Sequence, residues 1–122
     1  MSDLGRLCTA DGGVIYFAHP VSGETSPARA LRWLRWVAAQ APGAAIIAPW
    51  LAHICSGADD ADPEQRARHL EHDMRVVRRC DAIVLCGGRI SSGMQLEMTE
   101  ALGVGVVVLD LTHLGAEPPE AM

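Results

Sequence analysis

The sequence has no lysine, because all ten of its basic residues are arginine. This absence excludes a Schiff-base lysine, the lysine of a P-loop and every other mechanism that needs an amine side chain. Arginine is therefore the only fixed cation that can hold a phosphate or a carboxylate group.

Cysteine pairs and metal-ligand patterns are also missing. None of the four cysteines belongs to a CxxC pair. The pairs His53–Cys55 and His69–His72 each lack the second half of a zinc pattern. We therefore expect reduced thiols, no metal site and no cofactor.

Long apolar runs are absent too, and no run approaches the roughly 18 residues of a membrane span. No charged-then-apolar leader opens the sequence, so we expect a cytoplasmic protein without a membrane partner. The formal net charge of −5 disfavours binding to duplex nucleic acid. The length of 122 residues and the 49% hydrophobic content predict one domain with one core.

Apolar strands alternate with capped helices along the chain. The alternation predicts a parallel sheet of four or five strands with helices on both faces, which is a three-layer Rossmann-like, flavodoxin-like single domain over residues 1–122. Both strand orders 2-1-3-4 and 3-2-1-4 fit the pattern. We expect a loose arm over residues 1–12 and an irregular tail over 111–122. The predicted strands cover 14–18, 44–48, 82–86 and 104–109, and the predicted helices cover 26–41, 62–79 and 92–102, capped by Ser26, Asp62 and Ser92.

A ligand of such a sheet binds at the carboxyl ends of the strands, where the strand order reverses. In the order 2-1-3-4 this crevice lies between the first and third strands, which are followed by His19-Pro20 and by a glycine-rich loop. A glycine-rich loop that enters a capped helix offers backbone N–H groups and a helix dipole to an anion, although an ordinary strand-to-helix turn has the same appearance. The candidate binding residues of this loop are Gly87, Gly88, Arg89, Ser91, Ser92 and Gly93.

Two carboxylates lie at the borders of apolar helix faces. Glu97 borders the apolar face of the third helix, and Asp73 lies beside Val77 in the second. Partial burial of a carboxylate is unfavourable unless the group has a partner or a functional role. The alternative is that each carboxylate is an ordinary surface residue. Two carboxylates at one end of a sheet suit glycosidic chemistry.

The segment Tyr16-Phe17-Ala18-His19-Pro20 resembles the Tyr-x-Ala-Gly-Pro signature of the nucleoside 2-deoxyribosyltransferase-like superfamily. The run from Ser91 to Glu97, with Ala101 four residues later, resembles the Ser/Asp-x-Gly-x-x-x-Glu-x-x-x-Ala signature of the same superfamily. Asp73 matches its helix aspartate. The resemblance spans about residues 13–110 and is nearest to a small, largely uncharacterised branch from bacterial and phage genomes.

The resemblance implies that Glu97 is a nucleophile, that Tyr16 orients it and that Asp73 assists. Serine at position 91 is similar to the hydrolases that take nucleoside 5′-monophosphates. His19 departs from the family by replacing the usual glycine, and Met94 follows Gly93 where a small residue is common. We expect N-glycosidic bond cleavage or transfer on a nucleoside 5′-monophosphate.

Two other functions remain open. The first is a non-catalytic nucleotide or nucleotide-sugar sensor with the same crevice. The second is a flavodoxin-like electron carrier, which is weakly supported because only Tyr16 and Phe17 bring aromatic rings near the crevice.

The outer helix faces predict a homodimer, which the resemblance also implies. On the first helix we expect Trp33 at the edge of the inward face and Trp36 to face away. The residues expected to face inward are Leu31, Leu34, Val37, Ala38 and Ala41. On the third helix we expect Leu96 to point outward. Tryptophan and arginine together are typical of interface centres.

Overall fold

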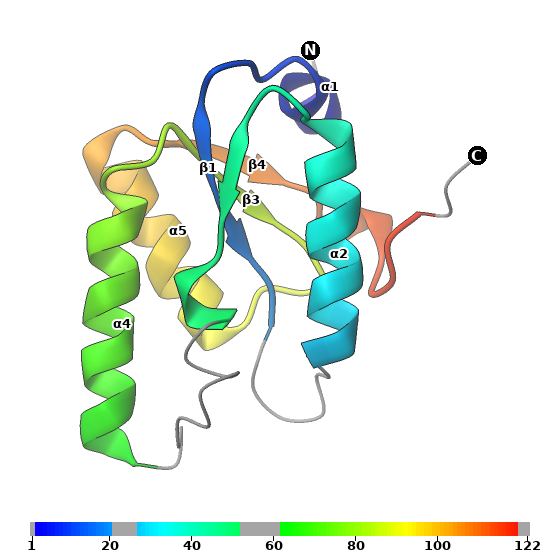
Figure 1. The fold of residues 1–122 in the computed structure, drawn as a ribbon. Coiled ribbons are helices and arrows are strands. Elements are labelled where there is room, and N and C mark those ends of the chain that lie inside the picture. The colour runs from blue at the N-terminus through cyan, green and yellow to red at the C-terminus, as the bar shows by residue number, and fades with distance from the viewer. Residues whose placement is uncertain (1, 21–26, 52–61, 120–122) are drawn as a thin grey trace.

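Four parallel strands form the centre of the protein, as the computed structural model in Figure 1 shows; it describes residues 2–20, 27–51 and 62–119. Their order is β2-β1-β3-β4. β1 pairs with both β2 and β3, as in the match of Tyr16 with Ile47 and with Ile83. The order 2-1-3-4 is confirmed and 3-2-1-4 is wrong. The strands are β1 (Val14–Ala18), β2 (Ala45–Ile47), β3 (Ala82–Leu85) and β4 (Val107–Asp110).

Helices cover both faces of the sheet, which confirms the three-layer α/β fold. Figure 1 shows α1 and α2 on one side of the strands and α4 and α5 on the other. The described helices are α1 (Asp3–Cys8), α2 (Pro27–Gln40), α4 (Pro63–Val77) and α5 (Ser92–Val104), with a 3-10 turn, η1 (Thr112–Leu114). Among the described residues, no helix combines the length and the apolar character that crossing a bilayer requires.

The N-terminal segment is a helix rather than the expected loose arm. The side chain of Ser2 caps α1 by accepting a hydrogen bond from the Gly5 N–H at 3.0 Å. Leu7 is fully buried in the core. The Asp3 carboxylate accepts a hydrogen bond from the Asp110 N–H at 3.0 Å, which attaches α1 to β4. These are tertiary contacts, so the polar sequence of residues 1–12 did not reveal them.

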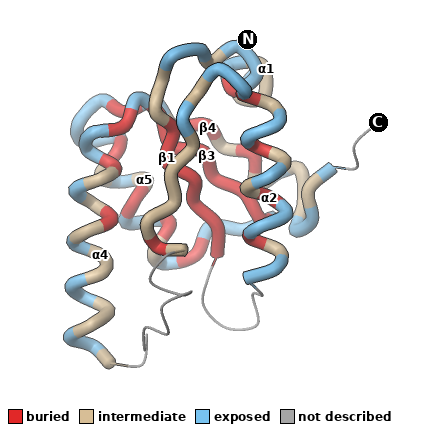
Figure 2. The backbone as a smooth tube through the Cα atoms, viewed as in Figure 1, coloured by how far each residue is buried: buried red, intermediate tan, exposed pale blue. Residues whose placement is uncertain are grey.

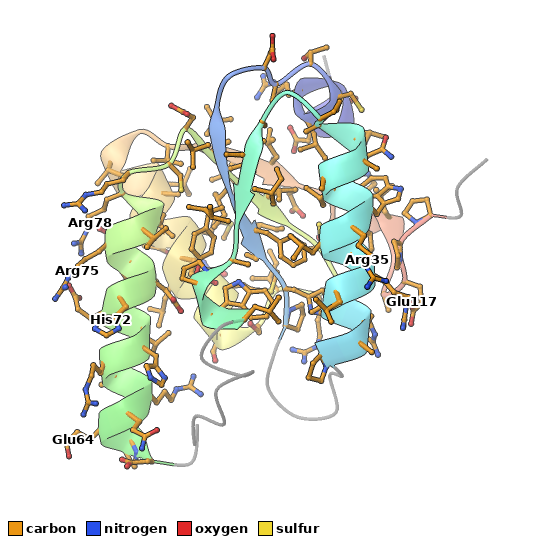
Figure 3. All side chains as sticks on the ribbon, in the orientation of Figure 1. Arg35, Glu64, His72, Arg75, Arg78 and Glu117 are labelled. Atoms are coloured by element: carbon orange, nitrogen blue, oxygen red, sulfur yellow. The ribbon has the colours of Figure 1, made fainter. Side chains whose placement is uncertain are left out.

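The tail after β4 is irregular beyond η1, as expected, but it is packed against α2. The Trp33 indole N–H donates to the Ala116 carbonyl oxygen at 2.7 Å. The Glu117 carboxylate accepts three hydrogen bonds from the Arg32 guanidinium, the shortest at 2.9 Å, and Figure 3 shows Glu117 beside α2.

The ends of α5 differ from the prediction at both sides. Ser91, not Ser92, is the N-cap, because its hydroxyl accepts a hydrogen bond from the Met94 N–H at 3.2 Å. At the other end, α5 continues to Val104 and stops at Gly105, whose φ of +81° suits glycine. β4 consequently begins at Val107, three residues later than predicted. Asp62 caps α4 as expected, and Ser26, His53 and Cys55 lie outside the described residues.

The buried face of α2 is rotated relative to the prediction. Trp33, expected at the edge, is fully buried, whereas Leu31 and Ala38, expected to face inward, are exposed. Trp36, expected to face away, is half-buried and packs edge-on against Trp33, with ring centres 5.4 Å apart. Burying Trp33 is favourable because Ala116 satisfies its polar atom. Figure 2 shows that the buried residues follow the strands and the helix faces turned toward them.

Candidate active site

Tyr16, Asp73 and Glu97 come together between the sheet and the pair α4 and α5. Tyr16 points to this face of β1, because Ile15 and Phe17 on either side must point to the other. Asp73 comes from α4 and Glu97 from the second turn of α5. The exposed fractions are 0% for Tyr16, 5% for Asp73 and 6% for Glu97. Both carboxylates, predicted at the border of the core, thus lie inside it.

Burial changes the acidity of Glu97. Desolvation and, to a smaller extent, the nearby Asp73 carboxylate raise the pKa of its carboxyl group, which is about 8 instead of the ordinary 4.5. The Tyr16 hydroxyl acts in the opposite direction and lowers this pKa, because it stabilises the ionised form. Glu97 is therefore largely protonated at neutral pH in the free protein.

The Tyr16 hydroxyl is equally affected. Desolvation raises its pKa above the usual value, and the negative charges of Glu97 and Asp73 add to the effect. The hydroxyl is near enough to Glu97 to influence its pKa, yet among the described residues no acceptor stands in full hydrogen-bond geometry. Tyr16 is thus a neutral donor that a small movement of Glu97 would engage.

An ion pair links the end of α4 to α5, the two helices that carry the carboxylates. The Arg78 guanidinium binds the Glu100 carboxylate across the two helices and also approaches Glu71 at 4.0 Å. Figure 3 shows Arg78 near one end of α4. Both contacts lie on the surface, so each contributes little stability by itself.

The glycine-rich loop adopts backbone conformations that favour glycine. The φ angles of Gly87 and Gly88 are +99° and +83°. A side chain on Gly87 would meet the Pro20 ring at 2.7 Å, and one on Gly88 would meet the Ala116 backbone at 2.8 Å. The loop therefore lies directly against the segment after β1, as expected for the crevice between β1 and β3. Of the other predicted loop residues, Ser91 is buried, Gly93 is half-buried, and Arg89 and Ser92 are exposed.

His19 and Pro20 are next to Gly87, but the His19 ring is on the α2 side of β1. The ring stacks on Phe17 with ring centres 6.2 Å apart, and Phe17 in turn stacks on Trp50. Tyr16 points to the opposite face. The predicted site residues therefore form two groups, the Tyr16–Asp73–Glu97 group and the group around His19 and the loop.

Three residues near the second group were missed by the sequence analysis. The Trp50 indole N–H donates to the Phe17 carbonyl oxygen at 2.6 Å. Arg29 of α2 and Glu117 of the tail lie close enough to His19 to influence its pKa. The position of Trp50 just after the second predicted strand is a signal that could have identified it. Arg29 and Glu117 carry no such signal, because only the folded chain brings them to His19.

The buried cysteines and the possible metal ligands show no sign of a second reactive site among the described residues. Burial raises the pKa of the Cys80 thiol to about 11 and also raises that of Cys86, so neither is a thiolate at neutral pH. Within residues 2–20, 27–51 and 62–119, no three histidine, cysteine or acidic side chains gather where they could bind a metal.

A family model described as a domain of unknown function, DUF7768, matches residues 13–109. The chain belongs to this family. No curated protein and no solved structure matches it.

The DUF7768 region contains the whole candidate site. Its boundaries enclose β1, α4, β3 and α5, and with them Tyr16, His19, Asp73, the glycine-rich loop and Glu97. Helix α1 and the tail from Leu111 lie outside it. The candidate site residues thus lie within the DUF7768 domain, and α1 and the tail are additions packed against it.

Proposed function

We propose that this DUF7768 domain cleaves or transfers the N-glycosidic bond of a nucleoside 5′-monophosphate through a covalent intermediate on Glu97. The observation that carries the proposal is the burial of Glu97 together with Asp73 and Tyr16. Burying two carboxylates side by side is expensive, and retaining glycosidases use such a pair.

Glu97 reacts in its ionised form in this mechanism, so its carboxyl group first loses its proton to solvent. An ionised Glu97 oxygen attacks the anomeric carbon. The bond from that carbon to the base breaks, and its electron pair leaves with the base, which takes a proton from water. Water or a second base then attacks the anomeric carbon and releases Glu97 as a carboxylate. The Asp73 carboxylate accepts the proton that the attacking group gives up and returns it to solvent.

The loop before α5 suits the phosphate group. The Ser91 hydroxyl accepts the Met94 N–H and keeps its own proton free for donation. The N-terminus of α5 supplies a positive dipole end, and the Arg89 side chain adds a charge. The resemblance of residues 91–97 to the superfamily signature supports the same assignment.

A panel of nucleoside 5′-monophosphates, with free base measured by chromatography, tests the proposal directly. We expect base release by the wild type and a loss of at least about a hundredfold in Glu97→Gln, because the nucleophile is gone. Glu100→Gln is the matched control, since Glu100 lies on the same helix but pairs with Arg78 on the surface. Full activity of Glu97→Gln, or no base release from any nucleotide, would contradict the proposal.

A sensor that binds a nucleotide without turnover is the second candidate. The raised pKa of Glu97 favours it, because a protonated carboxyl is a hydrogen-bond donor and a poor nucleophile. Calorimetry with the same panel separates the two functions: a sensor binds without base release and retains binding in Glu97→Gln.

We also propose a cytoplasmic homodimer. The outer face of α5 supports the dimer, since Leu96 and Leu102 are 51% and 64% exposed. Trp36, packed against Trp33, no longer supports an interface on α2. The described cysteines are free, which agrees with a reducing compartment.

A further inference from the structure

The His19 ring has a fixed proton position. Its Nδ1 atom lies 2.8 Å from the Pro20 carbonyl oxygen. A carbonyl oxygen only accepts hydrogen bonds, so Nδ1 must carry the proton and donate it. In a neutral ring the other nitrogen, Nε2, is then a lone-pair acceptor.

The surroundings keep this ring neutral. Desolvation lowers the pKa of His19, which is 3% exposed, and the positive charges of Arg29 and Arg89 lower it further. The Pro20 contact and the Glu117 carboxylate act in the opposite direction and do not reverse the net effect. At neutral pH, Nε2 thus remains an acceptor.

In the described part of the chain, that acceptor has no donor. Nε2 is buried and has no hydrogen-bond partner among the described residues. It lies where β1 and β3 end, because a side chain on Gly87 would meet it at 2.9 Å. A buried acceptor without a donor is unfavourable, and a donor that reaches it recovers that cost.

We propose that His19 Nε2 accepts a hydrogen bond from an uncharged donor group of the ligand and thereby selects nucleotides that possess it. The inference rests on the proposed function, since it assigns part of the same ligand. A phosphate dianion cannot make this contact, because it has only acceptors. Arg89 of the loop attracts the phosphate, while His19 binds a sugar hydroxyl or a base amino group of the same molecule.

The proton position is tested first, without any ligand. Long-range ¹H–¹⁵N spectra of ¹⁵N-histidine-labelled protein distinguish the two neutral forms of each ring, and the His19 signals are those missing from His19→Phe. We expect a protonated Nδ1 and a bare Nε2 from pH 6 to 8. A proton on Nε2 at pH 7 would overturn the proposal.

Calorimetry then identifies the donor. The ligands are adenosine 5′-monophosphate, its 2′-deoxy and 3′-deoxy forms, and purine riboside 5′-monophosphate, which lacks the amino group. Binding is measured in Glu97→Gln, to prevent turnover, with His19 intact or replaced by phenylalanine. We expect the loss of one of these hydroxyl or amino groups from the ligand to weaken binding about tenfold when His19 is intact. The same loss should have no effect in His19→Phe, because phenylalanine keeps a ring on Phe17 but has no acceptor.

The outcomes separate this inference from the proposed function. A nucleotide preference that is unchanged in His19→Phe overturns the role of His19 and leaves the reaction at Glu97 intact. Failure of these four nucleotides and of the whole nucleoside 5′-monophosphate panel to bind overturns the ligand class, and with it both proposals. Loss of base release in Glu97→Gln with an unchanged His19 preference overturns only the inference.

Discussion

The Tyr16 hydroxyl and the Glu97 carboxyl group face each other in the protein interior, and each changes the acidity of the other. Tyr16 lowers the pKa of Glu97, whereas Glu97 raises the pKa of Tyr16. The signs differ because the hydroxyl stabilises the ionised carboxylate, while the carboxylate opposes a second negative charge on the phenol. Asp73 destabilises the ionised form of both.

Replacing Glu97 should change how stability depends on pH. Its pKa is about 8 when folded and 4.5 ordinarily, so the unfolded chain loses this proton first as the pH rises. The contribution of Glu97 to stability is therefore complete below pH 4.5 and is lost between pH 4.5 and 8. A shift of one pKa unit corresponds to about 1.4 kcal/mol, so the free energy of unfolding falls by at most roughly 5 kcal/mol over this range.

Thermal unfolding at pH 5, 7 and 9 measures this effect. We expect Glu97→Gln to gain stability relative to the wild type as the pH rises, since glutamine never ionises. Glu100→Gln is the control and should follow the wild type. A constant difference between Glu97→Gln and the wild type at all three pH values would contradict the assignment.

The rate of base release should rise with pH. Only ionised Glu97 attacks the anomeric carbon, and its pKa in the free protein is about 8. We expect kcat/KM to increase from pH 6 and to level off above pH 8, because kcat/KM reports groups of the free enzyme. A profile that is flat between pH 6 and 9 would argue against Glu97 as nucleophile.

Tyr16→Phe should shift that profile without unfolding the protein. Removing the hydroxyl removes the group that lowers the pKa of Glu97, so the rising limb of kcat/KM should move to higher pH. The change in unfolding free energy should stay within about 1 kcal/mol, because the hydroxyl has no well-formed hydrogen bond to lose among the described residues. The pH profile and urea unfolding check the two parts separately.

Gly87→Ala should lower the free energy of unfolding of the protein. The new methyl group would meet Pro20 at 2.7 Å and the His19 ring at 2.9 Å, with φ at +99°. We expect a loss of roughly 1–3 kcal/mol in urea unfolding. Gly103→Ala is the matched control: nothing lies within 4 Å of its added atom, and alanine in a helix stabilises by up to about 1 kcal/mol. Equal stability of the two variants would disprove the close packing at Gly87.

Light scattering tests the proposed dimer. We expect twice the mass of 13.0 kDa at micromolar concentrations, and a shift toward the single-chain mass in Leu96→Glu, because a charge would be buried in the interface. Trp36→Glu is an unsuitable control, since Trp36 packs on Trp33. Leu31→Glu on the exposed face of α2 serves instead. A single-chain mass for the wild type would contradict the dimer.

The alternation of apolar runs with capped helices was enough to predict the α/β class, the parallel sheet and the approximate limits of the strands. These features depend on local preferences and on hydrophobic period, which the sequence contains directly. Glu97 and Asp73 were found in the same way, as carboxylates out of place on helix faces. Their depth was underestimated, because a helical wheel gives the direction of a side chain and not what packs over it.

Tertiary structure decided the rest. The polar N-terminus became a helix because Leu7 and Asp3 find partners on β4 and in the core, far away in sequence. Trp33 became the centre of the α2 face because the Ala116 carbonyl satisfies its indole N–H. The order of the strands placed Gly87 beside His19, and folding brought Arg29 and Glu117 near the same ring. Long-range pairing decides such contacts, because their free energy depends on groups that only folding brings within reach of each other.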